Sequence, residues 1–488
     1  MKRVFLILII LLIGVNTWAK VVNIDKARVV AVNFYFERAN SIKSISKDAI
    51  KTTNEKVITN NNDIVYYIFN IGDNGFIIIS AESNVTPILA YSLEKGFPVN
   101  TNVPALNWIL SSYKNEITNS RANHIQASDN IKKLWEIYSS NTKSTTSVEQ
   151  VLPMLGSINW DQSCYYNASC PADNDANYCN HNPTGCVATA MAQIMKYNAY
   201  PPQGTGSYSY NHYGTGYTNN YGTLSANFGA TTYNWASMPY TVTSTNAAVA
   251  TLMSQCGISV GMSYDVNGSG AIVGTTSTNY QGPTAEKAFK NYFKYTSAIY
   301  HKKSSYTEAQ WQALVLADVN YGRPILYAGD DGSAGHAFVL DGYQTTTSVY
   351  HYHFNFGWSG AGNGYFFIDT INPGTGGVGG GTYNFSTNEE GIFSLAKSTA
   401  GIESNNIPEV NIYPNPSNGN FTLDLSGLND SKIDIKVYNI VGEMVWDNIL
   451  NLKDNTLNLN LSTLHKGIYI LNINSGGNTF TKKITILK

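Results

Sequence analysis

The chain has 488 residues, more than the roughly 100 to 200 residues of one domain, so two to four folded units are expected. Apolar residues make up 43% and charged residues only 13%, which disfavours both disorder and a charge-rich coiled coil. Thirty-one basic residues against 33 acidic ones give a net charge of -2, too balanced for long-range attraction of nucleic acid or an anionic membrane, so no nucleic-acid partner is predicted.

The first residues have the pattern of an export signal. Lys2 and Arg3 precede an apolar run from Val4 to Val15, and the small residue Ala19 follows. Because such a run is shorter than the roughly 20 residues that cross a bilayer, a cleaved signal peptide over residues 1–19 is favoured over a retained anchor. In an oxidising compartment the five cysteines leave at least one that is unpaired or pairs with another chain.

The next part of the chain mixes strand and helix signals. Residues 66–71 and 76–80 are β-rich runs joined by Gly-Asp-Asn-Gly, which predicts a hairpin. Apolar residues at helical spacing over 106–117 and 131–138 predict two helices. The polar segment 141–147 has no apolar residue and no period, so we expect an exposed linker that proteases can cut.

The largest part, from about residue 151 to 397, begins with helices and continues with strands. Helices are predicted over 183–197 and 247–256, because apolar residues share a face in each. Four later runs alternate or cluster apolar residues between glycine turns, which is typical of an antiparallel sheet. These runs are residues 324–328, 336–340, 349–356 and 365–369. A helical subdomain packed on a sheet subdomain is expected.

The end of the chain reads as a small all-β unit. The polar stretch 401–408 is expected to link rather than fold. After it come strands of about five residues separated by turns, dimensions that suit a β-sandwich. The predicted strands are residues 421–425, 433–438, 457–461, 468–473 and 482–486.

Cys186 is a candidate nucleophile. It follows Asn-Pro-Thr-Gly, where Thr184 could cap a helix whose first turn carries the thiol. Backbone N–H groups and the positive end of the helix dipole favour a thiolate there, and the thiolate is the nucleophilic form. A buried structural cysteine or half of a disulfide is the alternative, and position alone does not decide between them.

A cysteine nucleophile needs a base, and His336 has the most suggestive setting of the eight histidines. Small residues at 333–335 precede it at the start of an apolar strand, which keeps the imidazole accessible. Asn355 lies on a strand that could neighbour His336 and could accept from an imidazole N–H. Gln162 could donate its amide to a developing oxyanion. For either amide alone, an ordinary polar surface residue is the favoured interpretation.

These residues stand in long motifs. The first motif, at residues 184–197, reads Thr-Gly-Cys-Val-Ala-Thr-Ala-Met-Ala-Gln-Ile-Met-Lys-Tyr. Two shorter motifs are Gly-His-Ala-Phe at 335–338 and Asn-Phe-Gly-Trp at 355–358. Together they resemble the streptopain and interpain group of papain-like cysteine peptidases. One departure is Phe356, where the family often has Trp.

The resemblance implies a role for each site residue. Cys186 is the implied nucleophile and His336 the proton acceptor and donor. Gln162 is the implied oxyanion donor, alongside the backbone N–H of Cys186. Asn355 is implied as an orienting residue and Trp358 as its aromatic cover.

The resemblance extends towards the N-terminus. Residues 75–82 and 87–91 look like the inhibitory prodomain of the family, which covers the active site until it is cut away. This implies an inhibitory prodomain over 20–145 and a papain-like catalytic domain over 146–398. Cutting is expected near 141–147.

The C-terminal motifs resemble a different module. Residues 413–416, 437–442 and 466–469 are similar to the C-terminal sorting domain of type IX secretion in Bacteroidetes. This implies a sorting β-sandwich over 409–488 after a linker over 399–408. It also implies export across both membranes, to a secreted or surface-attached state, with the secretion machinery as a partner.

Other motifs carry weaker signals. Residues 374–379 satisfy G-x-G-x-x-G but lack the strand and helix of a phosphate site, so a glycine loop is favoured. Residues 257–261 satisfy G-x-S-x-G but follow a helical pattern, contrary to a nucleophile elbow. His351 and His353 share a strand face without an evident third ligand, so no metal site is predicted.

The remaining cysteines have structural interpretations. Cys256 joins apolar residues at helical spacing and is expected in a core. Cys164, Cys170 and Cys179 lie in a loop-rich segment, where Cys170 with Cys179 is the preferred disulfide although sequence does not settle the pairing.

The expected protein is an α+β secreted cysteine endopeptidase made as a zymogen, with protein or peptide substrates, its own prodomain as inhibitor, and no metal or organic cofactor. The resemblance further implies a groove, bordered by the glycine loop, that prefers a bulky apolar residue just before the scissile residue. Ser269, Gly270 and Ala271 are expected to line it. The alternative is a catalytically silent surface adhesin or binding protein on the same fold, because low charge with abundant Tyr and Asn also suits surface contacts.

Overall fold

The computed structural model divides into two compact units, residues 1–398 and 399–488, and each is described by itself. No helix in the described part of the chain is both long and apolar enough to span a bilayer. The predicted signal peptide, the 141–147 and 401–408 linkers and the glycine motif at 374–379 lie outside the described residues. The structure describes residues 21–72, 75–98, 103–140, 148–213, 217–330, 335–346, 349–368, 389–397, 411–425, 432–439, 443–451, 456–475 and 478–487.

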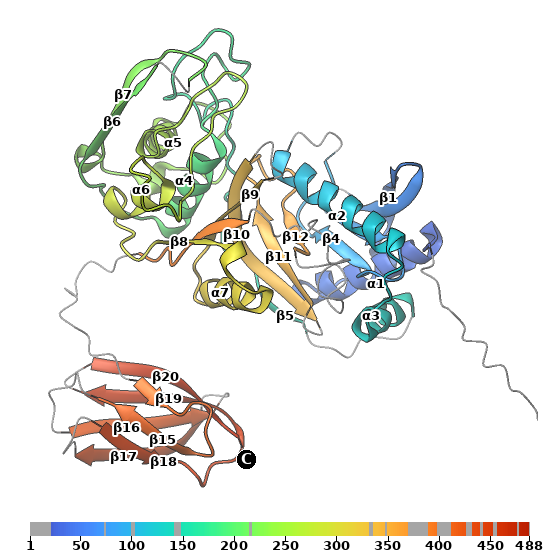
Figure 1. Ribbon diagram of the computed structural model, residues 1–488, viewed down its shortest axis with the longest axis vertical. Helices are drawn as coiled ribbons and strands as arrows, with labels where there is room; N and C mark the ends of the chain where they lie inside the picture. Colours follow the sequence, from blue (N-terminus) through green and yellow to red (C-terminus); the bar gives the residue numbers. More distant parts are fainter. Residues whose placement is uncertain are drawn as a thin grey trace, which may run out of the picture. The chain divides into compact units, whose positions relative to one another are not determined.

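One antiparallel sheet runs through the first unit, with eleven strands among the described residues (Figure 1). Its first four strands belong to the N-terminal part, and β4 continues the sheet by pairing with β12. β5 (Glu149–Val151) pairs with β10 beside the main path. In spatial order the other strands are β1 (Thr52–Asn60), β2 (Asp63–Ile71), β3 (Phe76–Ser80), β4 (Ile88–Ser92), β12 (Gly364–Phe366), β11 (Val349–Asn355), β10 (Gly335–Thr346), β9 (Ile325–Asp330), β13 (Glu390–Phe393) and β8 (Ile299–Lys302).

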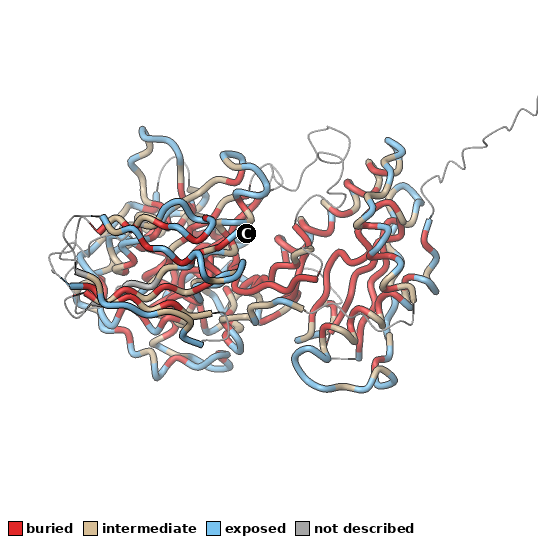
Figure 2. Tube along the Cα trace, turned by 90° about the horizontal axis from the view of Figure 1, so that it is seen from below, coloured by how far each residue is buried: buried red, intermediate tan, exposed pale blue. Residues whose placement is uncertain are grey.

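Helices cover both faces of this sheet. α1 (Ile24–Ile42) and α3 (Asp129–Ser139) share a core with Tyr67 and Phe69 of β2. α2 (Pro104–Ala122) and α7 (Glu308–Asn320) share another core with Tyr66 of β2. Alternate residues of β2 therefore enter different cores, which is why the strand is apolar without interruption from Ile64 to Phe69. Figure 2 shows how buried residues concentrate in the strands and the helix faces turned towards them.

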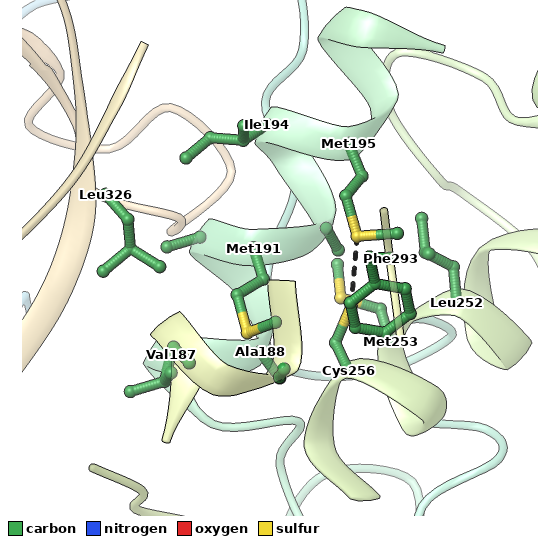
Figure 3. Close-up of a cluster of buried hydrophobic side chains, with 14 of the residues drawn as sticks. Val187, Ala188, Met191, Ile194, Met195, Leu252, Met253, Cys256, Phe293 and Leu326 are labelled. Carbon is green, nitrogen blue, oxygen red and sulfur yellow. Dashed lines mark hydrogen bonds between the residues drawn. The ribbon is translucent and has the colours of Figure 1, made fainter. Parts of the chain in front are cut away.

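The helices predicted around Cys186 and Cys256 form a second layer. α4 (Cys186–Asn198) packs on α5 (Ala247–Ser259), with α6 (Ala285–Asn291) and the β6–β7 hairpin (Ser207–His212, Gly222–Asn227) nearby. Figure 3 shows methionines, aliphatic side chains and the ring of Phe293 filling this contact. The Cys256 thiol lies 3.8 Å from the Met195 sulfur. Short 3₁₀ helices lie at Lys47–Ala49, Phe228–Ala230, Trp235–Ser237 and Lys303–Ser305.

The core position of Cys256 is confirmed, because the side chain is fully buried. The motif at 257–261 lies mostly within α5, which confirms that it forms no nucleophile elbow. The disulfide prediction is wrong: Cys164 pairs with Cys179, with 5.4 Å between their Cα atoms. Cys170 is a buried free thiol. Both pairings close short loops, so spacing did not distinguish them.

The second unit is the predicted β-sandwich. Strands β15 and β18 of one sheet and β16, β19 and β20 of the other send apolar side chains into a common core. β14 and β17 were not predicted. The sheets have the order β14 (Asn411–Tyr413), β15 (Asn420–Asp424), β18 (Thr456–Asn460), and β17 (Met444–Asn451), β16 (Lys432–Asn439), β19 (Gly467–Ser475), β20 (Asn478–Ile486).

Candidate active site

Cys186 is the first residue of α4, and Gly185 is its N-cap. Thr184 is therefore not the cap that the sequence suggested. Gly185 has φ +85°, and a Cβ there would lie 2.7 Å from the Met262 sulfur and 2.9 Å from the Ser269 carbonyl oxygen. Only glycine combines this backbone angle with so close an approach. The turn fixes the point at which the helix starts and so the position of the thiol.

The Cys186 thiol meets His336 across two elements, α4 and β10. Burial alone would raise the pKa of Cys186, because it disfavours the charged form. The positive charge and side-chain hydrogen bond of His336 oppose burial, together with backbone N–H groups of Ala337 and Val187. The net result is a Cys186 pKa below its ordinary value. The site therefore favours the thiolate form of Cys186 over the thiol.

His336 is the second residue of β10 and is 8% exposed. Its Nε2 accepts a hydrogen bond from the indole N–H of Trp358 at 3.2 Å. The same nitrogen lies 3.4 Å from the Phe356 carbonyl oxygen, to which it would donate in the other tautomer. Nδ1 is then the ring nitrogen left for the thiol. Because Phe356 contacts His336 through its carbonyl group, the Phe-for-Trp departure does not remove this contact.

Asn355 does not take the expected orienting position. It ends β11 opposite Val339 of β10. Its amide nitrogen donates to the Ile158 carbonyl at 2.8 Å, and its amide oxygen accepts from the Gly357 N–H at 3.1 Å. These bonds brace the turn after β11. The expected hydrogen bond from Asn355 to His336 is not among the contacts of the described residues, where Cys186 and Trp358 are the side chains that bond to the ring.

Gln162 lies in a loop beside the start of α4. Its backbone carbonyl accepts from the Thr184 N–H at 3.0 Å, two residues before Cys186. The side chain is mostly buried, with 8% of the residue exposed. Among the described residues its amide group has no hydrogen-bond partner. Gln162 is thus close in the fold to the helix that carries the thiol and has an amide free to donate.

The expected groove residues lie behind the same turn. The Ser269 hydroxyl donates to the Pro183 carbonyl at 2.7 Å, and its own carbonyl lies against Gly185. Gly270 pairs with Ser263 in an isolated bridge. Ala271 is partly exposed and packs against the α4 and α5 core. These residues adjoin the Cys186 turn, and the contacts described concern the fold rather than a bound peptide.

The N-terminal part reaches the site from the other side. The Trp108 indole of α2 lies against Gly329, the β9 neighbour of His336, where a Cβ would overlap the ring. The Lys95 ammonium donates to the Ser359 carbonyl at 2.8 Å, next to Trp358. These contacts were not predicted, because each joins residues more than 200 positions apart.

His351 and His353 have protein partners. His353 lies between Asp341, at 2.5 Å from Nδ1, and Glu94, at 2.8 Å from Nε2. The Nε2 atom of His351 lies 3.2 Å from the Ile88 carbonyl oxygen. Within the described part of the chain no group of three or more such side chains is arranged to hold a metal.

Three family models match the chain in order. The Spi protease inhibitor model matches residues 19–117, the Peptidase C10 family model matches 160–366, and the secretion system C-terminal sorting domain matches 411–487. The sorting domain indicates export, either to the cell surface or into the surroundings. The match order agrees with the three modules expected from the motifs.

Curated relatives include proteases. The chain is 29% identical to the thiol protease/hemagglutinin PrtT of Porphyromonas gingivalis over 457 residues, which cover 90% of this chain and 48% of that protein. It is 28% identical to streptopain of Streptococcus pyogenes over 342 residues, 67% of this chain and 80% of streptopain. The chain thus spans about half the length of the first relative and most of the second.

A solved structure covers both the N-terminal part and the region around Cys186. A fragment of prointerpain A from Prevotella intermedia superposes with a TM-score of 0.54 at 29% identity, covering 71% of this chain and 99% of that fragment. Over residues 160–366 the chain is therefore similar to cysteine proteases of the Peptidase C10 family, with an inhibitor-like segment before this part and a secretion sorting domain after it.

Proposed function

We propose that this chain is a secreted cysteine endopeptidase, made as an inactive precursor, that hydrolyses protein or peptide substrates through Cys186 and His336. The observation that carries the proposal is the contact of these two side chains, in which His336 and two backbone N–H groups together outweigh the effect of burial and lower the pKa of Cys186. A buried structural thiol has the opposite tendency, as Cys170 demonstrates, because burial raises its pKa to about 12.

The proposed reaction has two stages. The Cys186 thiolate attacks the peptide carbonyl carbon, and the Gln162 amide and the Cys186 backbone N–H donate to the oxygen that becomes negative. The His336 imidazolium gives its proton to the amide nitrogen, the C–N bond breaks and the amine leaves. A water molecule, losing a proton to His336, then attacks the thioester, releases the acid and regenerates the thiol group.

Trp358, rather than Asn355, is proposed to orient His336. The indole N–H donates to Nε2 of the imidazole, and the ring centroids lie 6.2 Å apart. When His336 is the imidazolium, Nε2 carries a proton and donates instead to the Phe356 carbonyl oxygen, 3.4 Å away, while the indole stays beside the ring. Asn355 is then a residue of the supporting turn. Peptide binding along Ser269, Gly270 and Ala271 remains part of the proposal.

The proposed domain order is a prodomain over 20–145, a catalytic domain over 146–398 and a sorting domain over 409–488. Inhibition by the prodomain is supported by Trp108 and Lys95, which reach the neighbours of His336 and Trp358. Removal of this part, by cutting near 141–147, would then open the site. The secretion machinery is the proposed partner of the sorting domain.

Active-site titration tests the proposal. The full chain, once its prodomain is released, is treated with a thiol-directed peptidyl inhibitor, and the bound label is counted by mass spectrometry. One label per molecule is expected for wild type and for the control Cys170→Ser, none for Cys186→Ala, and slow labelling for His336→Ala. Slow labelling of wild type, equal to that of an ordinary thiol, would instead favour the catalytically silent adhesin or binding protein.

Maturation gives a second test. If the chain cuts itself, Cys186→Ala accumulates as uncleaved precursor. Normal processing of that variant would show that another protease performs the cut, without affecting the assignment of Cys186.

A further inference from the structure

Asp161 precedes Gln162 and holds three hydrogen-bond donors. Its Oδ1 accepts from the backbone N–H of Gln162 at 2.6 Å and of Ser163 at 2.9 Å. Its Oδ2 accepts from the hydroxyl of Ser359 at 2.7 Å. Ser359 is 198 positions later in the chain and directly follows Trp358. One carboxylate therefore joins the segment of the proposed oxyanion donor to the segment that covers the imidazole.

Further bonds cross between the same two segments, which we name the oxyanion loop (residues 159–163) and the indole loop (residues 356–363). The Ser359 N–H donates to the Trp160 carbonyl at 3.1 Å. The Asn363 amide donates to the Asn159 side chain at 3.1 Å, and its oxygen accepts from the Phe356 N–H at 3.0 Å. Several hydrogen bonds thus hold the two loops together, and Asp161 is the one charged side chain among these bonds.

The backbone of Gln162 is held from two sides. Its carbonyl accepts from Thr184, just before the Cys186 helix, and its N–H donates to Asp161, which is bound to the indole loop. The first bond relates Gln162 to the thiol. The second relates it to Trp358 and so to His336. Both backbone polar groups of Gln162 are therefore hydrogen-bonded.

We propose that Asp161 is a positioning residue, whose carboxylate sets the distance between the Gln162 amide and the Trp358–His336 pair during peptide hydrolysis. The inference rests on the proposed function. Asp161 contacts neither the thiol nor the imidazole, so it acts through the two loops. A carboxylate suits the position because it accepts from all three donors, and hydrogen bonds to an ionised acceptor are about twice as strong as neutral ones.

The loss of kcat caused by changing Asp161 should not exceed the loss caused by removing the Gln162 amide. Loss of one oxyanion donor lowers kcat about 10²- to 10³-fold, and a displacement of about 1 Å near a reacting group can lower a rate by about 10²-fold. Asp161→Ala removes all three hydrogen bonds of the carboxylate, to Gln162 and Ser163 on one loop and to Ser359 on the other. A decrease in kcat of about 10- to 100-fold is therefore expected, with KM within about twofold. Ser359→Ala keeps the bonds to Gln162 and Ser163 and should lower kcat only a few-fold.

The experiment compares these variants in the full chain after prodomain release. Asp173→Ala is the matched control, because Asp173 also accepts from a backbone N–H, that of Asp175 at 2.9 Å, and from a hydroxyl, that of Tyr221 at 2.7 Å. Measurements are kcat and KM for a peptide substrate, the affinity of a peptide aldehyde, and the pH dependence of Cys186 alkylation. The aldehyde forms an adduct with a negative oxygen and so reports the oxyanion site.

A positioning role predicts a specific pattern. Asp161→Ala lowers kcat and aldehyde affinity by the same factor, leaves the alkylation profile unchanged, and adds little to the loss caused by Gln162→Ala. Ser359→Ala changes an exposed side chain, so the fold is expected to persist, and it shows the same pattern more weakly.

Three results would overturn the inference. The first is an Asp161→Ala variant that is as active as Asp173→Ala. The second is a double variant in which the kcat losses of Asp161→Ala and Gln162→Ala add in full. The third is a fall in the kcat of Asp161→Ala that equals the fall in the fraction of Cys186 that can be alkylated. Absence of turnover by wild type would overturn the proposed function itself. An active wild type with an unaffected Asp161→Ala variant would overturn this inference alone.

Discussion

Three cysteines without a disulfide partner lie in the first unit, and only one has a lowered pKa. Burial raises the pKa of Cys170 to about 12 and also raises that of Cys256. Cys186 experiences the same penalty, which His336 and two backbone N–H groups overcome. The sequence could place Cys186 at a helix start and Cys256 in a core from spacing alone. It could not choose the partner of Cys179, because the path of an irregular loop has no period.

Removing His336 should raise the pKa of Cys186 above that of an ordinary thiol, because burial then acts without the opposing imidazolium. In wild type the thiolate persists to a pH below the usual cysteine range. In His336→Ala the midpoint of alkylation should move to higher pH, with a rate at pH 6 at least about 10-fold lower, since one pKa unit changes the thiolate fraction about tenfold. Iodoacetamide labelling against pH checks this, and an unchanged midpoint would contradict it.

The Gly185 turn makes a prediction about stability. In Gly185→Ala the new Cβ combines a positive φ with overlap of Met262 and the Ser269 carbonyl, which should destabilise the fold by about 1–3 kcal/mol. Gly268→Ala is the control, because a Cβ there meets nothing within 4 Å. Thermal unfolding of the full chain measures both, and equal Tm values for the two variants would contradict the account.

At the scale of elements, the spacing of apolar residues predicted those helices and strands whose own sequence carries a clear pattern. α2, α3, the β2–β3 hairpin and the four strands around His336 were found from spacing. α1 was missed, although its buried residues follow helical spacing, because the last of them is Arg38 among otherwise apolar positions. β8 and β13 were missed as well, because each is short and is stabilised by strands distant in sequence.

The position of α2 predicts how the precursor is silenced. Trp108 fills the space above Gly329, beside His336, so Trp108→Ala should loosen α2 there and raise the activity of the uncleaved precursor several-fold. The control is Ser111→Ala, an exposed position on the same helix. Hydrolysis of a small peptide by precursor separated from mature enzyme is the measurement. Equal residual activity of wild type and Trp108→Ala would contradict the proposed blockade.

At the scale of the whole molecule, the prodomain and the catalytic part share one sheet. β4 pairs with β12 through Tyr91 opposite Tyr365 and Ala90 opposite Phe366. No local signal in the sequence indicates this pairing, because the partners are more than 270 positions apart. The modules themselves were predicted from motifs, and the pairing of Cys186 with His336 was predicted from the settings of the two residues and from the family resemblance.

A buried charge network crosses the same junction. Burial would lower the pKa of His353, but Asp341 of β10 and Glu94 of the prodomain raise it to about 10. Burial likewise opposes ionisation of Glu94, yet His353, followed by Lys95, holds the Glu94 pKa below its usual range. The ring of Tyr365 on β12 lies 5.0 Å away. His353 is therefore a cation bridging two parts of the precursor.

The directions of the His353 and Glu94 pKa shifts define the pH range in which this network stabilises the precursor. The stabilisation from His353 is full below the unfolded histidine pKa near 6.5 and is lost as pH rises through about 10. That from Glu94 is present above its unfolded pKa near 4.5 and is lost as pH falls through the lowered value. Between these limits both groups are charged, so the junction should be most stable from weakly acid to neutral pH.

Glu94→Gln tests this junction in a Cys186→Ala background, which prevents self-cleavage. The change should lower the Tm of the precursor by a few degrees near pH 6, and the difference from the parent should shrink as the pH falls through the lowered pKa of Glu94. Glu136→Gln, an exposed carboxylate on α3, is the control. A difference in Tm that is constant with pH would show that Glu94 acts by packing alone.

The most direct test of the central claim is cleavage of an unfolded protein such as casein by the full chain after prodomain release. The account predicts rapid hydrolysis by wild type and a loss of at least about 10³-fold in both Cys186→Ala and His336→Ala, because the thiolate and its proton partner act as one unit. Cleavage by Cys186→Ala at the wild-type rate would contradict it.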